Sequence, residues 1–335
     1  MKEKNVELEM NDSKKSKITV IIPARNEADK IGKCLQAVLA QSLKPCEVIV
    51  VDGHSTDGTV EIAGKFPVRV LYEDYHTIGG GRQLGVEKAK GDYVAFTDAD
   101  AIPDKEWIGN LIQEFDDGII GVGGKIVNID RGFWQRSINL AFSTFLGSAN
   151  AVQGRLFKRK RLVNTVSACN SMYRRQDILE VGGFNTNLIS EDSELNGRLL
   201  KKGKLLYTPE AVVLHDQDKG LKDFAKLMFR WGKGIRETRR WKVQVMPPLL
   251  VPLLIPCAIF LPKVFFALLG LYFLGTLAIG ANFAIREKDI RYLVSIPLVY
   301  IIQHTLYSAG FWKEVLRPHR IKNKPNNEEN NGGHK

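Results

Sequence analysis

The sequence predicts an α/β protein with a mostly parallel sheet, followed by apolar helices long enough to cross a membrane. Three observations support this prediction. Short β-branched runs alternate with segments of helical periodicity through the first hundred residues. Acidic residues follow the ends of several of these runs. Beyond residue 243 the composition changes sharply to long stretches without charged residues.

The alternation of strands and helices can be followed along the first part of the chain. Apolar runs at 18–22, 47–51, 68–72 and 93–97 predict strands. Between them we expect a helix over 28–41, a second helix after the polar turn at 53–59, and a third that opens at Gly79. Strands that alternate with helices pair in parallel through right-handed crossovers. Pro103 is expected to end the fourth extended run and to open the next helix.

The later elements are predicted in the same way. The run at 119–128 predicts a strand with glycines for close approach, and the run at 211–214 is also strand-like. A helix is expected over 133–149 and another over 193–202.

Composition limits the class of protein. The chain has 335 residues, of which 44% are hydrophobic, so it can bury one large core or two. Its formal net charge of +11 indicates a polyanionic partner, namely nucleic acid, anionic lipid or a small polyanionic substrate. The four cysteines are scattered without a paired or zinc-binding spacing, which is typical of reduced thiols in the cytosol. The polar residues 1–17 predict a disordered tail and no signal peptide.

Asp98 and Asp100 directly follow the predicted strand at 93–97. Ligands of open α/β sheets lie outside the carboxyl ends of the strands, so both side chains are expected at a ligand site. Two carboxylates so close together repel each other, and a divalent cation relieves that repulsion. Oxygen ligands suit Mg²⁺ or Mn²⁺ bound together with a diphosphate. The alternative is an acidic loop that caps the next helix.

The same edge of the sheet is expected to carry Glu27, Asp52 and Arg82. A nucleotide lying there would meet carboxylates for its base and ribose and a cation for its phosphates. Asp52 and Asp57 have an alternative role, because aspartates often cap turns and helices. The glycines at 79–81 match neither a dinucleotide-binding motif nor a P-loop, and an ordinary flexible loop is their alternative.

Three segments together resemble family 2 glycosyltransferases of the GT-A fold: VIIPARNE, VVDGHSTDGT and GRQLG…KGDYVAFTDAD. The resemblance extends from about residue 18 to 234. It implies a nucleotide-sugar site formed by Pro23, Ala24, Arg25, Glu27, Asp52, Arg82, Asp98 and Asp100, with Asp98 and Asp100 also at the cation. The sequence departs from the family at Gln83, where asparagine is common, and at Gly53, where a second aspartate is common.

The resemblance also assigns roles in the second half. Asp192 matches the second carboxylate of the family's Glu-Asp pair and is the expected catalytic base, supported by Glu191. The alternative is that both acids complement the dipole of the helix that starts there. His215 is a candidate metal ligand, although a lone histidine is often structural. Arg230 and Trp231 resemble the element on the acceptor and diphosphate side, or belong to a basic helix on a membrane.

Two further segments point to a membrane. The aromatic helix at 133–149 precedes five cations in 155–161, which together resemble an interfacial segment near 133–161 that meets anionic headgroups. A core helix followed by a solvated loop is the alternative. Within 243–313, the stretches 264–285 and 292–312 lack Asp, Glu, Lys and Arg and are expected to span, whereas the Pro-rich stretch before them is doubtful.

We therefore expect a GT-A domain over 18–242, a membrane segment over 243–313 and a basic polar tail over 314–335. The protein is expected in the cell membrane as a multi-pass protein with a cytoplasmic catalytic domain. The expected activity is metal-dependent, inverting transfer from a nucleotide sugar to a hydroxyl of a lipid-linked acceptor. Nucleic acid is excluded as a partner because no recognition motif accompanies the basic residues.

Three other functions remain open from the sequence. They are transfer to a polyprenyl phosphate itself, nucleotidyl or phosphoryl transfer on a similar sheet, and a non-catalytic nucleotide-binding membrane module.

Overall fold

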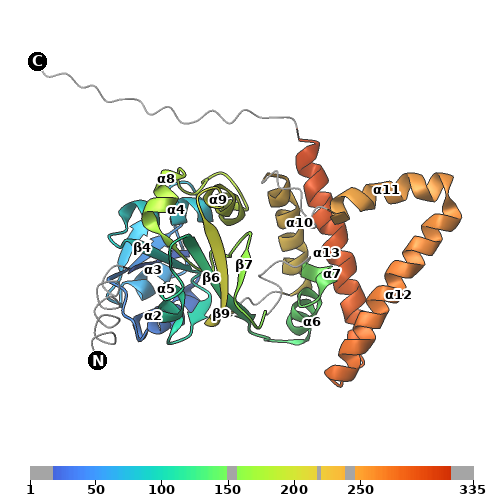
Figure 1. Cartoon of the computed structure of the whole chain (residues 1–335). Coiled ribbons are helices and arrows are strands. Elements are labelled where there is room, and N and C mark those ends of the chain that lie inside the picture. Colours follow the sequence, from blue (N-terminus) through green and yellow to red (C-terminus); the bar gives the residue numbers. More distant parts are fainter. Residues whose placement is uncertain (1–17, 149–156, 217–219, 238–245, 318–335) are drawn as a thin grey trace, which may run out of the picture.

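The computed structural model describes residues 18–148, 157–216, 220–237 and 246–317 (Figure 1). These residues form an α/β half and a layer of helices beside it. The expected tail at 1–17, most of the tail at 314–335 and two residues of the basic run at 155–161 lie outside the described residues.

Four parallel strands form the first half of a nine-stranded sheet. They are β3 (Arg69–Tyr72), β2 (Glu47–Asp52), β1 (Ile18–Ala24) and β4 (Tyr93–Thr97), in that spatial order. Helices α2 (Ala28–Leu39), α3 (Thr59–Ala63) and α4 (Ile78–Lys88) connect them. The predicted strands and helices of this region are confirmed to within a few residues, because β-branched runs and helical periodicity alternate here without ambiguity.

The second half of the sheet is mixed, with one long parallel pair of strands among antiparallel pairs. Next to β4 lie β8 (Asn170–Arg174), β6 (Ile119–Asn128), β9 (Lys204–His215) and β5 (Ala101–Pro103), while β7 (Arg161–Val163) pairs with β9. β8 runs antiparallel to both β4 and β6. Helices α5 (Trp107–Ile112), α8 (Arg175–Glu180) and α9 (Glu191–Leu199) complete this half.

Pro103 does not open a helix. It is the last residue of β5, which pairs with the end of β9, and α5 begins only at Trp107. Long-range pairing of this kind leaves no mark on the local sequence. It matters for function because the register sets Ala101 opposite His215 and thereby joins the ends of β4 and β9.

Apolar clusters cover both faces of the sheet. One contains buried residues of α2 and α5, and the other contains buried residues of α4, α8 and α9. The two clusters fix the sheet from both sides, so the loops at the carboxyl ends of β1, β2 and β4 stand on a rigid base.

A third cluster joins helices from distant parts of the chain. Its buried residues come from α6 (Phe133–Phe142), α10 (Leu221–Glu237), α12 (Pro262–Arg286) and α13 (Tyr292–Val315). The expected helix at 133–149 is interrupted after α6 and continues as the short α7 (Phe145–Ser148). The apolar face of α6 packs on α13, so it is covered by protein, although Trp134 of α6 and Phe145 of α7 stay exposed.

Among the described residues one helix, α12, is long and apolar enough to cross a membrane. The expectation of a multi-pass protein is therefore not supported. The expected second span corresponds to α13, of whose 24 residues ten are buried among its neighbours. Its polar residues also have partners, since Gln303 donates to the carbonyl of Gly147 and the Ser295 hydroxyl pairs with that of Ser137.

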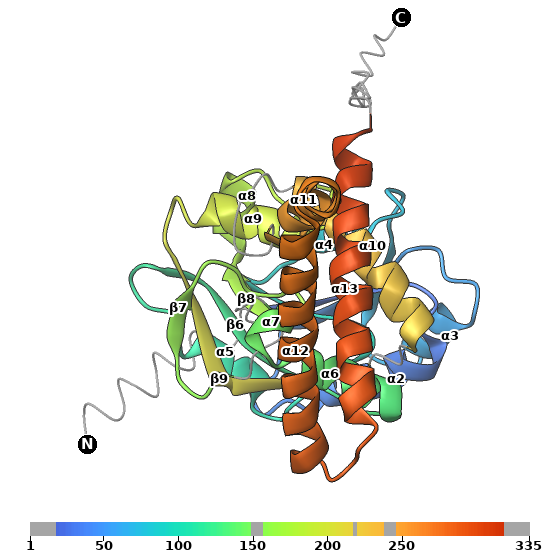
Figure 2. The ribbon, with the colours of Figure 1, turned by 90° about the vertical axis from the view of Figure 1, so that its right-hand side faces the viewer.

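Helices α11 (Met246–Phe260) and α12 stand away from the sheet (Figures 1 and 2). Both expose many large apolar side chains, and α13 lies between them and α10. The α/β half and the exposed apolar helices thus lie on opposite sides of α10 and α13.

Candidate active site

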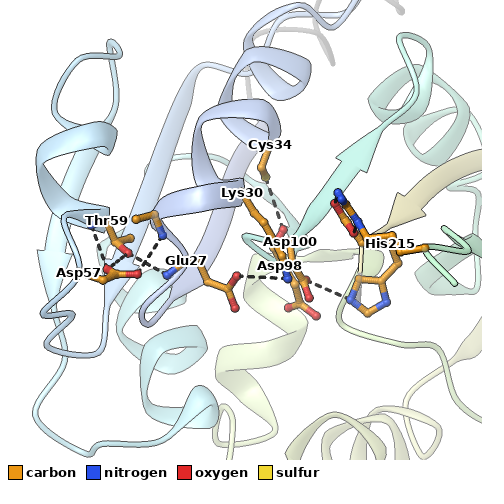
Figure 3. A network of polar contacts seen from close by, with 11 residues as sticks. Glu27, Lys30, Cys34, Asp57, Thr59, Asp98, Asp100 and His215 are labelled. Atoms are coloured by element: carbon orange, nitrogen blue, oxygen red, sulfur yellow. Dashed lines mark hydrogen bonds and ion pairs between the residues drawn. The ribbon is translucent and has the colours of Figure 1, made fainter. Parts of the chain in front are cut away.

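The loop after β1 is tied to the loop after β2. Asn26, which has a positive φ of 55°, accepts from the Thr56 amide at 2.9 Å. Asp57 accepts from the Ala28 amide at 3.0 Å and from the Thr59 hydroxyl at 2.5 Å (Figure 3). Asp57 therefore has the capping role that the sequence left open. These bonds fix the start of α2 and, with it, Glu27.

Asp52, at the end of β2, is fully buried. Its carboxylate accepts from the Ser55 amide at 2.8 Å and from the Ser55 hydroxyl at 2.5 Å. The structure thus gives Asp52 a turn-stabilising role in addition to its place at the edge of the sheet. Pro23 and Ala24 are also buried within β1, whereas Arg25 is exposed.

Arg82 joins two acidic side chains from distant elements. Its buried guanidinium donates to Glu191 at the start of α9 and, at 2.8 Å, to Asp98 after β4. Close approach of α4 makes this possible, because a Cβ at Gly79 would lie 3.1 Å from the side chain of Glu191. The predicted Arg82 and Asp98 are therefore in direct contact.

Asp98, Asp100 and His215 converge where β4 and β9 end. Nε2 of His215 lies 3.0 Å from Oδ1 of Asp100. One ligand atom each of Asp98, His215 and Cys169 lies within 4.8 Å of the others. Glu27 points toward the two aspartates from the start of α2 (Figure 3). The structure thus brings together the three residues that the sequence predicts at the cation.

Burial, and then repulsion between neighbouring acids, raises the pKa of two carboxyl groups at this edge. Burial, followed by repulsion from Asp100, raises the pKa of Glu27 to about 6. Burial raises the pKa of Glu191 to about 7, because the single Arg82 guanidinium is shared and does not fully compensate. Excess negative charge at this edge of the sheet is an environment that favours a bound cation.

The residues present fit a divalent cation. Asp98 and Asp100 offer hard oxygen ligands, and His215 offers an imidazole nitrogen.

Asp192 is half-buried in the first turn of α9, next to Glu191. Its carboxylate accepts from the Ser193 amide at 2.6 Å and lies 3.5 Å from the Ala168 amide. Asp192 thus lies beside the Arg82 network and close to the residue that precedes Cys169.

Arg230 and Trp231 are exposed on α10. Opposite faces of one turn of this helix contact different parts of the molecule. Gly234 packs against Ser190 and Ile189, directly before Glu191, and Gly232 packs against the backbone of Tyr307 in α13. Helix α10 therefore connects the loop before α9 to the C-terminal helices.

Two residues at the site were missed in the sequence. Cys169 precedes β8 and is buried beside His215. Glu73 follows β3 and is also buried, and its Oε2 has no hydrogen-bond partner among the described residues. A carboxylate after a strand was a usable signal for Glu73. Cys169 had none, because its position depends on the antiparallel pairing of β8 with β4.

Comparison with known proteins gives the same family as the sequence motifs. The model of the family described as Glycosyl transferase family 2 matches residues 19–182. Glycosyltransferase AglE of Haloferax volcanii is 31% identical over 227 residues, which cover 65% of this chain and 72% of that protein.

A second relative covers nearly the whole chain. The dolichyl N-acetyl-alpha-D-glucosaminyl phosphate 3-beta-D-2,3-diacetamido-2,3-dideoxy-beta-D-glucuronosyltransferase of Methanococcus voltae is 25% identical over 326 residues, 90% of this chain and 97% of that one. Among solved structures, the mannosyltransferase PcManGT from Pyrobaculum calidifontis, in complex with GDP-Man and Mn²⁺, has a TM-score of 0.63 at 19% identity. The match covers 90% of this chain and 87% of that chain.

The mixed sheet and these matches define a glycosyltransferase of the GT-A fold. The chain belongs to glycosyl transferase family 2.

Proposed function

We propose that the protein is a membrane-anchored, divalent-cation-dependent, inverting glycosyltransferase. It moves a sugar from a nucleotide-sugar donor to a hydroxyl group of a lipid-linked acceptor. The observation that carries the proposal is the convergence of Asp98, Asp100 and His215 beside the Arg82–Glu191 ion pair, with Asp192 adjacent.

The donor lies at the carboxyl ends of β1, β2 and β4. The nucleoside side of the site is formed by Glu27, Asp52 and Arg25. Arg82 holds the side chains of Asp98 and Glu191 in place through its two ion pairs. Asp98, Asp100 and His215 would hold Mg²⁺ or Mn²⁺, which would supply positive charge to the diphosphate leaving group.

Asp192 is the general base on the acceptor side. The acceptor oxygen attacks the anomeric carbon from the face opposite the diphosphate, the bond from that carbon to the phosphate oxygen breaks, and the hydroxyl proton passes to the Asp192 carboxylate. Glu191 orients Arg82 through their ion pair. Arg230 and Trp231 lie on the acceptor and diphosphate side and stabilise phosphate and sugar groups.

Two findings support a lipid-linked acceptor. The relative from Methanococcus voltae, which aligns over 90% of this chain, is named for transfer to a sugar carried on dolichyl phosphate. In this chain α12 is apolar, mostly exposed and about 37 Å long at 1.5 Å per residue, which exceeds the roughly 30 Å of a bilayer's hydrocarbon core. The net charge of +11 favours a cytoplasmic catalytic half beside anionic headgroups.

A screen of nucleotide sugars tests the donor site. We expect one class of donor to raise the melting temperature of the full-length protein, and to do so only with Mg²⁺ or Mn²⁺ present, because a ligand of the folded state stabilises it. Donor binding that is unaffected by a chelator would contradict the cation site. Release of pyrophosphate in place of a nucleoside diphosphate would indicate a nucleotidyltransferase.

Asp192→Asn tests the base. Removal of a general base lowers the rate by about 10²–10⁴-fold, so we expect the variant to bind the donor normally and to lose transfer to a hydroxyl acceptor. Glu194→Gln, which removes one acidic charge from the same helix, is the matched control. Full-rate transfer to polyprenyl phosphate by Asp192→Asn would favour the alternative acceptor, because a phosphate is already ionised.

A further inference from the structure

Cys169 lies close to Asp98 because of strand pairing. In the antiparallel pair of β4 and β8, Thr97 lies opposite Asn170, so the next residues outward are Asp98 and Cys169. In the antiparallel pair of β5 and β9, Ala101 lies opposite His215. Backbone register thus delivers an oxygen, a sulfur and a nitrogen ligand to one point, from residues that are distant in sequence.

The three ligand atoms are close enough to share an ion. They lie within 4.8 Å of one another. Around a tetrahedral ion with bonds of 2.0–2.3 Å, ligand atoms are about 3.3–3.8 Å apart, so a shift of roughly 1 Å closes the set. Cys169 and His215 are buried, whereas Asp98 is half-buried and leaves the set reachable.

The surroundings hold these ligands in place. Asn170, next to Cys169, donates to the carbonyls of Lys125 and Ala211 and accepts from the Trp107 indole at 2.8 Å. His215 contacts Asp100 at 3.0 Å, which is the arrangement of a metal-binding histidine oriented by a neighbouring carboxylate. Ligands held in this way need little reorganisation to bind.

We propose that Asp98, Cys169 and His215 form a binding site for a thiophilic divalent cation, for which Zn²⁺ is the best fit. The set has one sulfur, one nitrogen and one oxygen ligand, and Zn²⁺ accepts all three with a fourth position left open. Mg²⁺ prefers an all-oxygen set. On binding, the Cys169 thiol loses its proton to the buffer and its sulfur bonds to the metal, with no change of oxidation state.

The proposed Zn²⁺ site has ligands from three distant segments and overlaps the site of the proposed Mg²⁺ or Mn²⁺. Cysteine spacing in the sequence predicts no zinc site, because the ligands are far apart along the chain. The site shares Asp98 and His215 with the cation of the proposed function, so Zn²⁺ and that cation exclude each other. This exclusion rests on the proposed function, whereas the binding of Zn²⁺ itself does not.

Titration of the full-length protein with Co²⁺, in the absence of any donor, tests the binding. We expect one Co²⁺ per chain and a sulfur-to-metal charge-transfer band, and displacement of Co²⁺ by one equivalent of Zn²⁺ but not by a large excess of Mg²⁺. Cys169→Ser should remove the band. It should also weaken Zn²⁺ binding by more than about 10–100-fold, which is the loss typical of removing a residue that only orients a metal ligand.

Cys34→Ser is the matched control. Cys34 is also buried, and its thiol lies 3.4 Å from the carbonyl oxygen of Asp98, but its sulfur is not one of the three ligand atoms. This variant should keep the charge-transfer band. Absence of the band in the wild type, or an unchanged band in a folded Cys169→Ser protein, would overturn the proposal. Neither result depends on sugar transfer, so the test is separate from that of the proposed function.

Discussion

Burial among the acidic side chains at one edge of the sheet raises the pKa of Glu27 and lowers the stability of the fold at neutral pH. Burial and repulsion from Asp100 raise its pKa from 4.5 to about 6. A group whose folded pKa is raised binds its proton more tightly in the folded state. Ionised Glu27 therefore destabilises the fold above pH 6, and this effect disappears as the pH falls below 4.5.

Glu27→Gln should therefore stabilise the cation-free protein at pH 7.5. The difference between the two pKa values corresponds to about 2 kcal/mol, which predicts a melting temperature several degrees higher, by about 2–4 °C per kcal/mol. The gain should shrink as the pH approaches 4.5. Thermal unfolding in the presence of a chelator measures it, and the exposed Glu61→Gln is the control. An equal gain at pH 7.5 and pH 4.5 would show that charge is not the cause.

At the scale of single residues, the sequence predicted the acidic side chains at this edge of the sheet and missed Cys169. Asp98 directly follows β4, and Asp100 and Glu27 are each the third residue after a strand. The carboxyl ends of parallel strands meet at one edge. His215 required the end of β9 to reach that edge, which the resemblance suggested and the pairing with β5 achieves. The position of Cys169 depends on β8, which pairs antiparallel with β4. No local pattern in the sequence predicts this pairing.

At the scale of elements, α10 is the link between the two parts of the molecule. Gly234 faces Ser190 and Ile189, and Gly232 faces the backbone of Tyr307. A side chain at either position would overlap with its neighbour. The two glycines therefore fix the position of α10 against the loop before α9 on one side and against α13 on the other.

Gly234→Ala should lower kcat by roughly 10–100-fold, because the new methyl group displaces Ser190 and with it the Glu191–Asp192 turn. Ser190 makes no capping hydrogen bond through its side chain, so Ser190→Ala should have little effect. The double variant should recover much of the lost rate because the overlap with the hydroxyl is removed. A double-mutant cycle of kcat measures this coupling.

Gly232→Ala is the contrasting control in this cycle. Its overlap is with the backbone of Tyr307, which Ser190→Ala does not relieve. Recovery of Gly232→Ala by Ser190→Ala, or no recovery of Gly234→Ala, would contradict a direct contact between α10 and the turn that begins at Ser190.

The sequence predicted most elements, but not those that depend on contacts between distant segments. Strands at 18–24, 47–52, 93–97 and 119–128 were recognisable from their β-branched runs. The expectation of a second span at 292–312 is not supported by the described residues, of which only α12 is long and apolar enough to cross a membrane. In the structure α13 packs against α6, α10 and α12. Pro103 was misplaced because its role in β5 comes from distant pairing.

At the scale of the whole molecule, α11 and α12 form an exposed apolar surface beyond α13 (Figure 1). On α12 this surface includes Phe266, Leu271 and Leu274, each 67% exposed. Isolated exposed apolar residues are ordinary, but a continuous surface of this kind marks contact with a membrane or a partner.

Leu271→Lys/Leu274→Lys should weaken attachment to membranes. A lysine at the centre of a membrane helix costs about 2.5–3.5 kcal/mol, so two of them should shift the protein from the membrane fraction to the soluble fraction. Flotation with lipid vesicles measures the change. Leu162→Lys, at an equally apolar position that is 55% exposed in the α/β half, is the control. An unchanged membrane fraction in the double variant would show that α12 does not insert.

The contacts of α10 have a geometric consequence for acceptor choice. Glycine contacts hold α10 between α13 and the turn that carries Asp192. In the proposed function α12 lies in the lipid, so the Asp192 carboxylate would stand at a set height above the headgroups. A carrier whose terminal sugar lies one ring too near or too far from the surface does not reach it. We therefore expect acceptors that differ by a single sugar in glycan length to differ steeply in turnover.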